Sequence, residues 1–355
     1  MVWLRGALFT GALAFLVLTF VNASWIVTAT PGRPRLIANG GITQDYKPGG
    51  RAAPCPAREI LPPLHAILED TARAVFTARR MGADYVAIDV VRTADNTLAL
   101  YPDADLGCRT EATGPVTQMT MAGLARLDAG YGYSADGGKT FPLRGKGRGL
   151  IPSLDEILAA SANGRFIYRF PGNDLAAVPL LVAALQRNGH DARALGEGFV
   201  GNAALVAAVN KALPGAWTID PAQSHACTDA YRWQGWTSLV PATCQGATMI
   251  AGLTDSFPKG AMTLWGWPNR VQQRIEGVGG HVMAVANEGS GNTLGTNSLG
   301  TGLRHARELP QVPAAFHGTV LIDNFWAVGP ALRPDMDART NAEAVAAQDR
   351  DENTP

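Results

Sequence analysis

The chain has 355 residues, with 30 basic and 30 acidic side chains and therefore no formal net charge. This balance argues against nucleic acid as a partner, because proteins that bind phosphate backbones usually carry a basic excess or a basic stripe. Length alone is compatible with two or three domains, but α/β barrels of this size form one unit.

The N-terminal segment is uncharged from residue 6 to residue 32. Arg5 precedes the apolar run ALFTGALAFLVLTFV, and the small residues VNA at 21–23 offer a cleavage site, as in a signal peptide. The run is also long enough to cross about 30 Å of hydrocarbon as a helix. A buried soluble helix fits less well, because no polar face interrupts the run. We expect an exported, periplasmic or otherwise extracytoplasmic protein, and both a cleaved signal and a membrane anchor stay open.

From residue 35 onward, short β-rich runs alternate with helical patterns. The predicted strands lie at 35–39, 85–90, 165–170, 191–199, 216–220, 247–253, 281–287 and 318–324. The predicted helices lie at 68–81, 117–127, 153–161, 174–188, 202–212, 268–277 and 302–309. Repeated strand–helix units of this kind predict a parallel sheet, and about eight of them predict a (β/α)₈ TIM barrel. A doubly wound open sheet is the alternative, but the first strand is not followed by a Gly-x-Gly-x-x-Gly turn.

These elements divide the chain into three parts. Residues 1–32 form the signal peptide or membrane anchor, 33–332 form the barrel, and the polar tail 333–355 is predicted to be disordered. Two inserts interrupt the barrel, a Pro/Gly-rich stretch at 40–66 and a glycine-rich basic loop at 129–152. The basic loop has the composition of an anion cradle, although a solvated hairpin is the more frequent meaning.

Four cysteines fit an exported chain, because disulfides persist in oxidising compartments. Four cysteines allow three pairings. The pair Cys227–Cys244 is preferred because it closes a short loop, which would stabilise the fold by about 3 kcal/mol. Cys55 and Cys108 would then form the second disulfide. A zinc site is a weak alternative, since no Cys-x-x-Cys pair is present.

Polar residues stand where two early strands end. Asp89 lies near the end of strand 85–90, and a polar turn at 94–96 leads into a second strand at 97–101 that ends in Tyr101-Pro102-Asp103. Barrel enzymes carry their catalytic groups at the carboxyl ends of strands. We therefore expect this part of the chain to face a site.

Several separated motifs resemble the glycerophosphodiester phosphodiesterase family. The stretch LEDTARAVFTARRMGADYVAIDVVRTADNTLALYPDADLGCRT at 68–110 is similar to the family's Glu-Asn-Thr, Gly-Ala-Asp, Glu-x-Asp-Val and His-Asp motifs in the family's order. RLIANGG at 35–41 resembles its first strand, which ends in His-Arg-Gly. LDAGYGYSADGGKTFPLRGKGRGLIPSLDEIL, WQGWTSLVPATC and LWGWPNRV look like segments of an exported branch. The resemblance runs from about residue 35 to about residue 330.

The resemblance implies a metal-dependent hydrolase. In the family, a Glu-x-Asp pair and a further carboxylate hold a divalent cation, and two histidines act as general acid and base. The cation offsets the negative charge that develops on the phosphodiester, and the imidazoles move protons to and from the reacting oxygens.

Most of that set is replaced in this sequence. The family's two histidines fall on Asn39 and Tyr101, and the Glu of Glu-x-Asp falls on Ala87. The strand that should carry the later carboxylate offers Tyr168 and Arg169. An amide or a phenol with a pKa near ~10 does not replace an imidazole that titrates near neutrality. An arginine in place of a carboxylate repels a cation but can bind phosphate directly.

Two acidic residues survive, Glu69 and Asp89. Both are candidate metal ligands, and with Asn39, Tyr101 and Arg169 they form the set of candidate ligand-binding residues. Each has a structural alternative: Glu69 can stabilise a helix start, and Asp89 can bond a backbone group or Arg92. If the site is active, its cofactor is Ca²⁺ or Mg²⁺, and a purely binding site needs none.

None of the six histidines falls at a catalytic position of the family. His65 and His225 are candidates for a relocated base, although a lone histidine in a loop is usually a surface residue. Four tryptophans, at 233, 236, 265 and 267, follow two late strands and are candidates for a substrate platform or for packing around Cys227–Cys244.

Two functional hypotheses follow. The first is a phosphodiesterase-like barrel with impaired catalysis that binds a glycerophosphate or lipid-headgroup ligand. The second is an active phosphoric diester hydrolase of lipid metabolism that releases glycerol 3-phosphate through a rearranged site. Both expect a small phosphodiester or headgroup as ligand and contact with a membrane through the N-terminal segment, and neither involves nucleic acid.

Overall fold

The computed structural model describes residues 2–27, 32–253, 266–287 and 299–353. Its main sheet contains eight parallel strands in the order β6-β5-β4-β2-β1-β9-β8-β7, and β3 pairs antiparallel with β2. The strands are β1 (Arg35–Asn39), β2 (Tyr85–Arg92), β3 (Leu98–Leu100), β4 (Phe166–Arg169), β5 (Gly198–Val200), β6 (Trp217–Ile219), β7 (Thr248–Gly252), β8 (His281–Val285) and β9 (Thr319–Ile322).

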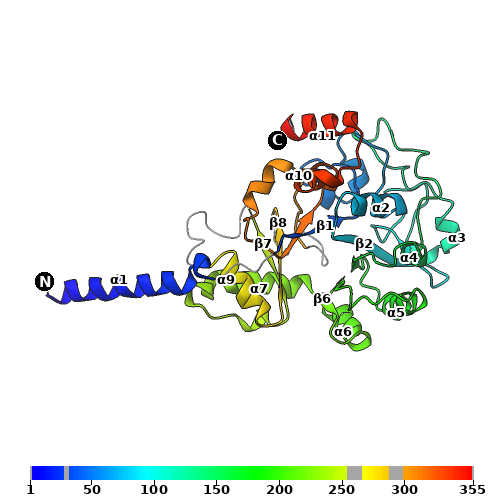
Figure 1. Cartoon of the computed structure of the whole chain (residues 1–355). Coiled ribbons are helices and arrows are strands. Elements are labelled where there is room, and N and C mark those ends of the chain that lie inside the picture. The colour runs from blue at the N-terminus through cyan, green and yellow to red at the C-terminus, as the bar shows by residue number, and fades with distance from the viewer. Residues whose placement is uncertain (1, 28–31, 254–265, 288–298, 354–355) are drawn as a thin grey trace.

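The parallel strands curl into a nearly closed barrel, as the sequence predicts (Figure 1). Its interior is filled by buried apolar side chains from successive strands, among them Ile37, Ile167, Ile250 and Met283. A side-chain hydrogen bond of 2.8 Å from Trp217 Nε1 to Thr248 Oγ1 connects β6 to β7, the two ends of the paired series. The (β/α)₈ prediction is confirmed.

Helices cover the outside of this barrel. They are α2 (Ala72–Arg80), α4 (Leu154–Ala159), α5 (Ala177–Arg187), α6 (Ala203–Ala212), α7 (Pro221–Gln234), α9 (Asn269–Glu276) and α10 (Phe325–Leu332). Two further helices lie elsewhere: α3 (Met121–Leu124), in the segment between β3 and β4, and α11 (Asn341–Asn353), which packs against α10. A capping box begins α4, in which Ser153 and Glu156 each accept a hydrogen bond from the other's backbone amide.

Several elements differ from the sequence prediction. The strand expected at 191–199 is limited to β5 (Gly198–Val200), and the helix expected at 117–127 is divided into η4 (Val116–Gln118) and the short helix α3. The segment after β6, taken as a loop, forms α7, because Asp220 caps its first turn and Pro221 occupies the first helical position. The helix expected at 302–309 is a 3₁₀ segment, η7 (Ala306–Gln311), which contains Pro310. Proline lacks the amide hydrogen that an α-helix needs.

The C-terminal tail also departs from the prediction of disorder. Within the described residues it forms α11, whose first turn is capped by Thr340 and Glu343. Ala347 is buried, and Asp351 accepts a 2.8 Å hydrogen bond from His305 Nδ1. The alanine-rich composition of this helix and its contact with η7 outweigh the polar character of the tail.

The two inserts fold together into a second apolar cluster beside the barrel. Its buried members include Tyr46, Ile60, Leu106 and Leu143. The predicted disulfides are both present, with Cα–Cα distances of 5.3 Å for Cys55–Cys108 and 4.7 Å for Cys227–Cys244. The first disulfide connects one insert to the segment that follows β3.

The N-terminal helix α1 (Val2–Asn22) projects away from the barrel (Figure 1). Its window from Arg5 to Asn22 is long and apolar enough to cross a membrane, and only 6 % of that window is buried. Such a helix fits either a signal or an anchor, and the two disulfides are compatible with an extracytoplasmic location.

Candidate functional site

A cavity of about 440 Å³ opens at the carboxyl ends of the barrel strands. Asn39 ends β1, Arg169 ends β4, and Asp323 directly follows β9. Parallel strands bring these positions to one end of the barrel. The register places Asn39 beside Ala87 and Asp89 beside Arg169. The cavity walls also include Tyr46, Arg51, Glu69, Asp103, Arg109, Thr301 and Arg304.

The turn after β1 allows the next segments to approach the cavity closely. Gly40 and Gly41 have φ angles of +78° and +79°, a region that favours glycine. A Cβ atom on Gly41 would lie 2.7 Å from the carbonyl carbon of Ala74 in α2. The conformation and the contact with α2 together require glycine at this position.

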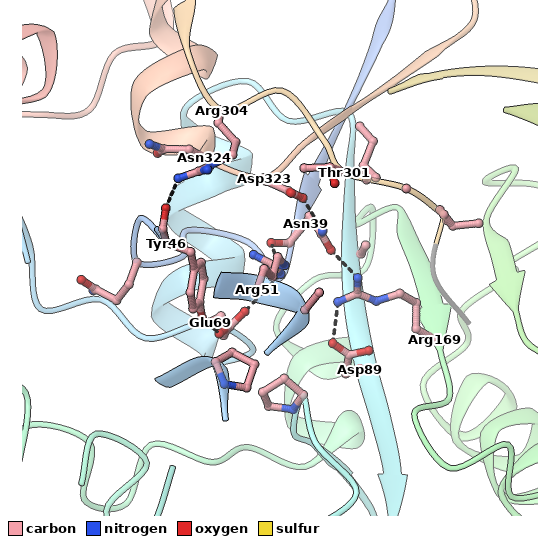
Figure 2. A pocket seen from close by; sticks show the side chains of 18 of the residues that line it. Asn39, Tyr46, Arg51, Glu69, Asp89, Arg169, Thr301, Arg304, Asp323 and Asn324 are labelled. Atoms are coloured by element: carbon pink, nitrogen blue, oxygen red, sulfur yellow. Dashed lines mark hydrogen bonds and ion pairs between the residues drawn. The ribbon is translucent and has the colours of Figure 1, made fainter. Parts of the chain in front are cut away.

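One continuous chain of hydrogen bonds crosses the mouth of the barrel (Figure 2). The Arg169 guanidinium donates to the Asp89 carboxylate, Nη2 to Oδ2 at 2.5 Å, and its Nη1 donates to Oδ1 of Asn39. Asn39 then donates from Nδ2 to Asp323 Oδ1 at 2.6 Å. The side chains of three different strand ends are therefore held in fixed positions.

Glu69 is the centre of a second, more deeply buried network. Arg109 donates to its Oε1 at 2.5 Å, Arg51 donates to its Oε2 at 3.2 Å, and the Tyr46 hydroxyl donates to Oε1. Burial by itself raises the pKa of Glu69, but the charges of Arg109 and Arg51 and the Tyr46 hydrogen bond outweigh it and lower the pKa to about 2. Glu69 is therefore ionised at neutral pH.

Asp70, the residue after Glu69, is buried and has a φ angle of +55°, in the left-handed region. Its Oδ1 accepts a 3.0 Å hydrogen bond from the backbone amide of Asp89. Burial, followed by the nearby Asp89 charge, raises the pKa of Asp70 well above its ordinary value. Burial also raises the pKa of the Asp89 carboxyl group, although the positive charge of Arg169 opposes this shift.

Part of this site lies in a segment that matches a known protein family. The model of the Glycerophosphoryl diester phosphodiesterase family matches residues 57–171, which contain Glu69, Ala87, Asp89 and Arg169. In this segment, about a third of the chain, the sequence is similar to the glycerophosphoryl diester phosphodiesterase family. The resemblance found in the sequence is thereby confirmed.

The curated relatives match over limited segments. The uncharacterized protein Rv2277c of Mycobacterium tuberculosis is 30% identical over 93 residues, which is 26% of this chain and 31% of that protein. The glycerophosphodiester phosphodiesterase of Bacillus subtilis is 29% identical over 126 residues, covering 34% of this chain and 42% of the relative. The matched part of the chain thus spans less than half the length of either relative.

Solved phosphodiesterase structures share the fold over most of the chain. The glycerophosphoryl diester phosphodiesterase domain of Rv2277c has a TM-score of 0.55 and 17% identity, and the alignment covers 85% of this chain and 99% of that domain. A putative glycerophosphoryl diester phosphodiesterase from Silicibacter pomeroyi has a TM-score of 0.54 and 16% identity, with 87% and 95% coverage. These likenesses establish the barrel architecture.

The site does not fit the metal that the phosphodiesterase resemblance implies. A Ca²⁺ or Mg²⁺ ion needs several oxygen ligands directed at one point. Within the described residues, no group of three or more His, Cys, Asp or Glu side chains is arranged to hold an ion. Glu69 is bound by two arginines and Asp89 by Arg169, whose positive charge repels a cation.

The structure brings together four of the five candidate ligand-binding residues. Asn39, Glu69, Asp89 and Arg169 line the cavity. Tyr101 does not: it is 1% exposed, and its hydroxyl donates to the Leu106 carbonyl at 3.3 Å. A direct contact of Tyr101 with a ligand is therefore not supported, because its side chain packs into the second apolar cluster.

Neither candidate for a relocated base lines the cavity. The His65 ring packs against Trp326 with centroids 4.6 Å apart, and burial lowers its pKa to about 4. His225 lies in α7. The alternative partner of Asp89, Arg92, is bound to Asp174 at 2.6 Å.

The substrate platform predicted from the tryptophans is not found in the described residues. Trp267 is buried against Phe316, while Trp233 and Trp236 are exposed and lie outside the cavity lining. Trp265 lies outside the described residues. In the basic loop, Asp128 accepts hydrogen bonds from the amides of Gly130 and Gly147, and Asp136 accepts them from the amides of Lys139 and Thr140. These four amides are therefore bonded within the loop.

Sequence reasoning missed several residues of the cavity. Asp323 lies near the end of the strand expected at 318–324, and the rule that selected Asp89 also applies to it. Arg51 and Arg109 come from segments in which no periodic pattern marks a residue as facing a site. Arg304 falls in the helix expected at 302–309, but it precedes η7, which begins at Ala306. Their common signal is weak, since an isolated arginine in a loop is usually a surface residue.

Proposed function

We propose that this protein is a phosphodiesterase-like barrel that binds a small glycerophosphate or lipid-headgroup ligand and does not hydrolyse it by the family's metal and histidine chemistry. The proposal rests on one observation above all. Arg169 lies in the cavity wall and is bound to Asp89 and Asn39, on the strand where the family resemblance predicts a metal carboxylate. In this proposal the guanidinium charge of Arg169 binds the phosphate where the family resemblance implies a divalent cation.

Arginine suits this role because its planar guanidinium offers several donors that match phosphate oxygens and stays charged at all physiological pH values. Arg169 uses Nη1 and Nη2 within the site, and its buried Nε has no hydrogen-bond partner among the described residues. Arg51 likewise has a buried Nη1 without a partner in the described part of the chain. Both guanidinium groups retain donor capacity for an oxyanion after a small rearrangement.

The charges of the cavity wall indicate a ligand of mixed polarity. The lining contains five basic and five acidic residues: Lys47, Arg51, Arg109, Arg169 and Arg304 against Asp45, Glu69, Asp89, Asp103 and Asp323. Guanidinium groups bind phosphoryl oxygens, whereas carboxylates accept hydrogen bonds from hydroxyl groups. A phosphorylated polyol such as glycerol 3-phosphate carries both, and the volume of about 440 Å³ lies in the usual range for small-molecule sites.

The pKa values of Glu69 and Tyr46, two residues of the cavity wall, support impaired catalysis. A general acid or base works best when its pKa lies near the working pH. The pKa of Glu69 is about 2, and burial raises the pKa of the Tyr46 hydroxyl above its ordinary value of 10. Histidine, the usual proton carrier near neutrality, is not among the described residues that line the cavity.

The second candidate is an active hydrolase with a rebuilt site. It is favoured by the gathering of Glu69, Asp89 and Asp323 around one cavity at the catalytic end of a barrel whose family is hydrolytic. Such a site would need a carboxylate to leave its arginine and bind Ca²⁺ or Mg²⁺.

Binding and turnover measurements on the full-length protein in detergent separate the two candidates. Calorimetric titration with sn-glycerol 3-phosphate should detect binding, and Arg169→Gln/Asp89→Asn, which removes both charges of the pair, should weaken it by about tenfold to a hundredfold. Arg187→Gln, at an exposed ion pair with Asp155, is the matched control and should bind as the parent does.

Turnover of glycerophosphocholine and glycerophosphoethanolamine should stay at background with Ca²⁺, Mg²⁺ or EDTA. Metal-dependent hydrolysis that disappears in Glu69→Ala/Asp89→Ala would contradict the proposal and establish the rebuilt hydrolase. Absence of binding in the parent protein, with no turnover, would reject both candidates for these ligands.

A further inference from the structure

The N-terminal helix does not pack along the barrel, yet its last turn is built into it. Most apolar side chains of α1 are exposed, for example Phe9 at 73% and Leu16 at 64%. Asn22 and Ala23, by contrast, are 0% exposed. A flexible linker would leave both exposed. The helix therefore leaves the folded domain from a fixed point (Figure 1).

Asn22 makes the central contacts of this junction. Its Nδ2 donates to the Trp236 carbonyl at 2.7 Å, and its Oδ1 accepts from Arg274 Nη2 at 2.8 Å and from the Ser238 hydroxyl at 3.3 Å. These partners belong to two separate segments, the turn after α7 and helix α9. Because the buried side-chain amide of Asn22 is hydrogen-bonded to both segments, it holds the end of α1 against the turn after α7 and against α9.

The next residues extend the junction. Ser24 belongs to η1 (Ser24–Ile26) and accepts a 2.9 Å hydrogen bond from the backbone amide of Asn269, while Asn269 Nδ2 donates to the Ser24 carbonyl at 3.2 Å. The bond between Ala23 and Ser24, which a signal peptidase would cut after VNA, thus lies within a packed and hydrogen-bonded segment.

Large apolar side chains surround the point where α1 leaves the barrel. Trp25 is 76% exposed, Trp233 85%, Trp236 43% and Leu239 67%. They come from η1, the end of α7, η5 (Gly235–Thr237) and the turn that follows, and the Asn22 contacts bring these segments together. Tryptophan prefers the boundary between lipid headgroups and hydrocarbon, because its ring is apolar and its indole N–H is polar.

We propose that α1 is retained as a membrane anchor and that Trp25, Trp233, Trp236 and Leu239 form a docking surface that enters the headgroup layer of the same bilayer. The occupant is lipid because the surface surrounds the exit point of a helix whose 18-residue apolar window can span a membrane. The rigid junction at Asn22 sets the orientation of the barrel. None of these four residues lines the cavity, so docking leaves it free.

The test uses the full-length protein in vesicles of phosphatidylcholine and phosphatidylglycerol. An environment-sensitive dye is attached to Leu239→Cys, and separately to Leu175→Cys, a control position that is 49% exposed and lies outside the proposed surface. All native cysteines of the described chain are in disulfides, so each introduced thiol is labelled selectively. Lipids carrying a quencher near the headgroup should quench the dye at 239 several-fold more than the dye at 175.

Asn22→Ala isolates the role of the junction. This variant keeps α1 in the bilayer, but the barrel loses its fixed orientation, so quenching at 239 should fall towards the value at 175 while membrane association is unchanged. Intact mass of the membrane-extracted chain should include residues 1–23.

Three results would overturn the proposal. The first is a mature chain that starts at Ser24, and the second is equal quenching of the dyes at 239 and 175. The third is quenching at 239 that falls as the protein-to-lipid ratio rises. The last would indicate that a second copy of the chain, and not lipid, covers this surface. Binding of glycerol 3-phosphate is measured separately, so failure of either proposal leaves the other standing.

Discussion

Arg169 and Asp89 are neighbours in the β2–β4 register, and their charged groups lie 2.5 Å apart at the mouth of the barrel. Their side chains are 17% and 10% exposed. The pair occupies the part of the phosphodiesterase scaffold where the family resemblance implies metal coordination. The anion site proposed above rests on this pair.

Removing Arg169 should destabilise the fold. Arg169→Leu leaves the Asp89 carboxylate without its counter-charge beside buried Asp70, which should cost about 2–4 kcal/mol in the free energy of unfolding. Urea unfolding at pH 7 measures the loss. Arg187→Leu, at an exposed pair with Asp155, is the control and should change stability by less than about 0.5 kcal/mol. Equal effects of the two substitutions would show that the Arg169–Asp89 pair is energetically an ordinary surface pair.

Glu69 should determine part of the acid stability. Its pKa is lowered on folding to about 2, so its contribution is fully present above the unfolded pKa near 4.5 and is lost as the pH falls through about 2. The shift corresponds to about 3 kcal/mol at neutral pH. Glu69→Gln should therefore be less stable than the parent at pH 7, and the two should converge towards pH 2. Parallel urea-unfolding curves from pH 2 to 7 would argue against this linkage.

Asp70 should have the opposite pH dependence. Its pKa is raised on folding, so its contribution is full below the unfolded pKa near 3.8 and declines as the pH rises through the folded value. Asp70→Asn, which restores the residue type of the family motif, carries no charge at any pH. It should unfold at higher urea than the parent at pH 8, by about 1–2 kcal/mol, and differ little at pH 4. A variant less stable than the parent at pH 8 would contradict the assignment.

Metal binding should be recoverable by substitution. Ala87→Glu/Arg169→Glu places two new carboxylates beside Asp89 on adjacent strands and removes the charge that repels a cation. The variant should gain thermal stability with Ca²⁺, by about 2.7 kcal/mol when the ion is at a hundred times its dissociation constant. Ala87→Gln/Arg169→Gln has nearly the same shape without the charges and should show no Ca²⁺ effect. Thermal unfolding with Ca²⁺, Mg²⁺ or EDTA measures both variants.

The sequence by itself determined the barrel and much of the site. The alternation of apolar strands with capped helices requires a layered α/β fold. This alternation can be read from the sequence, because the spacing of apolar residues within each strand or helix involves only residues close together in the chain. The phosphodiesterase resemblance selected Asn39, Asp89 and Arg169 as candidate site residues, and the structure places all three in the cavity wall. The short loop between Cys227 and Cys244 also favoured the disulfide that forms.

Only the tertiary structure decided how these groups pair. Arg109 and Glu69 are 40 positions apart, and the distance of 2.5 Å between them depends on how an irregular segment folds over the barrel. The same holds for Asn22, whose partners Trp236 and Arg274 lie more than 200 positions away. Local periodicity carries no information on such contacts, because loops lack a repeating pattern and their side-chain directions are set by packing. The strand ends were thus predictable, whereas the charge network that changes their chemistry was not.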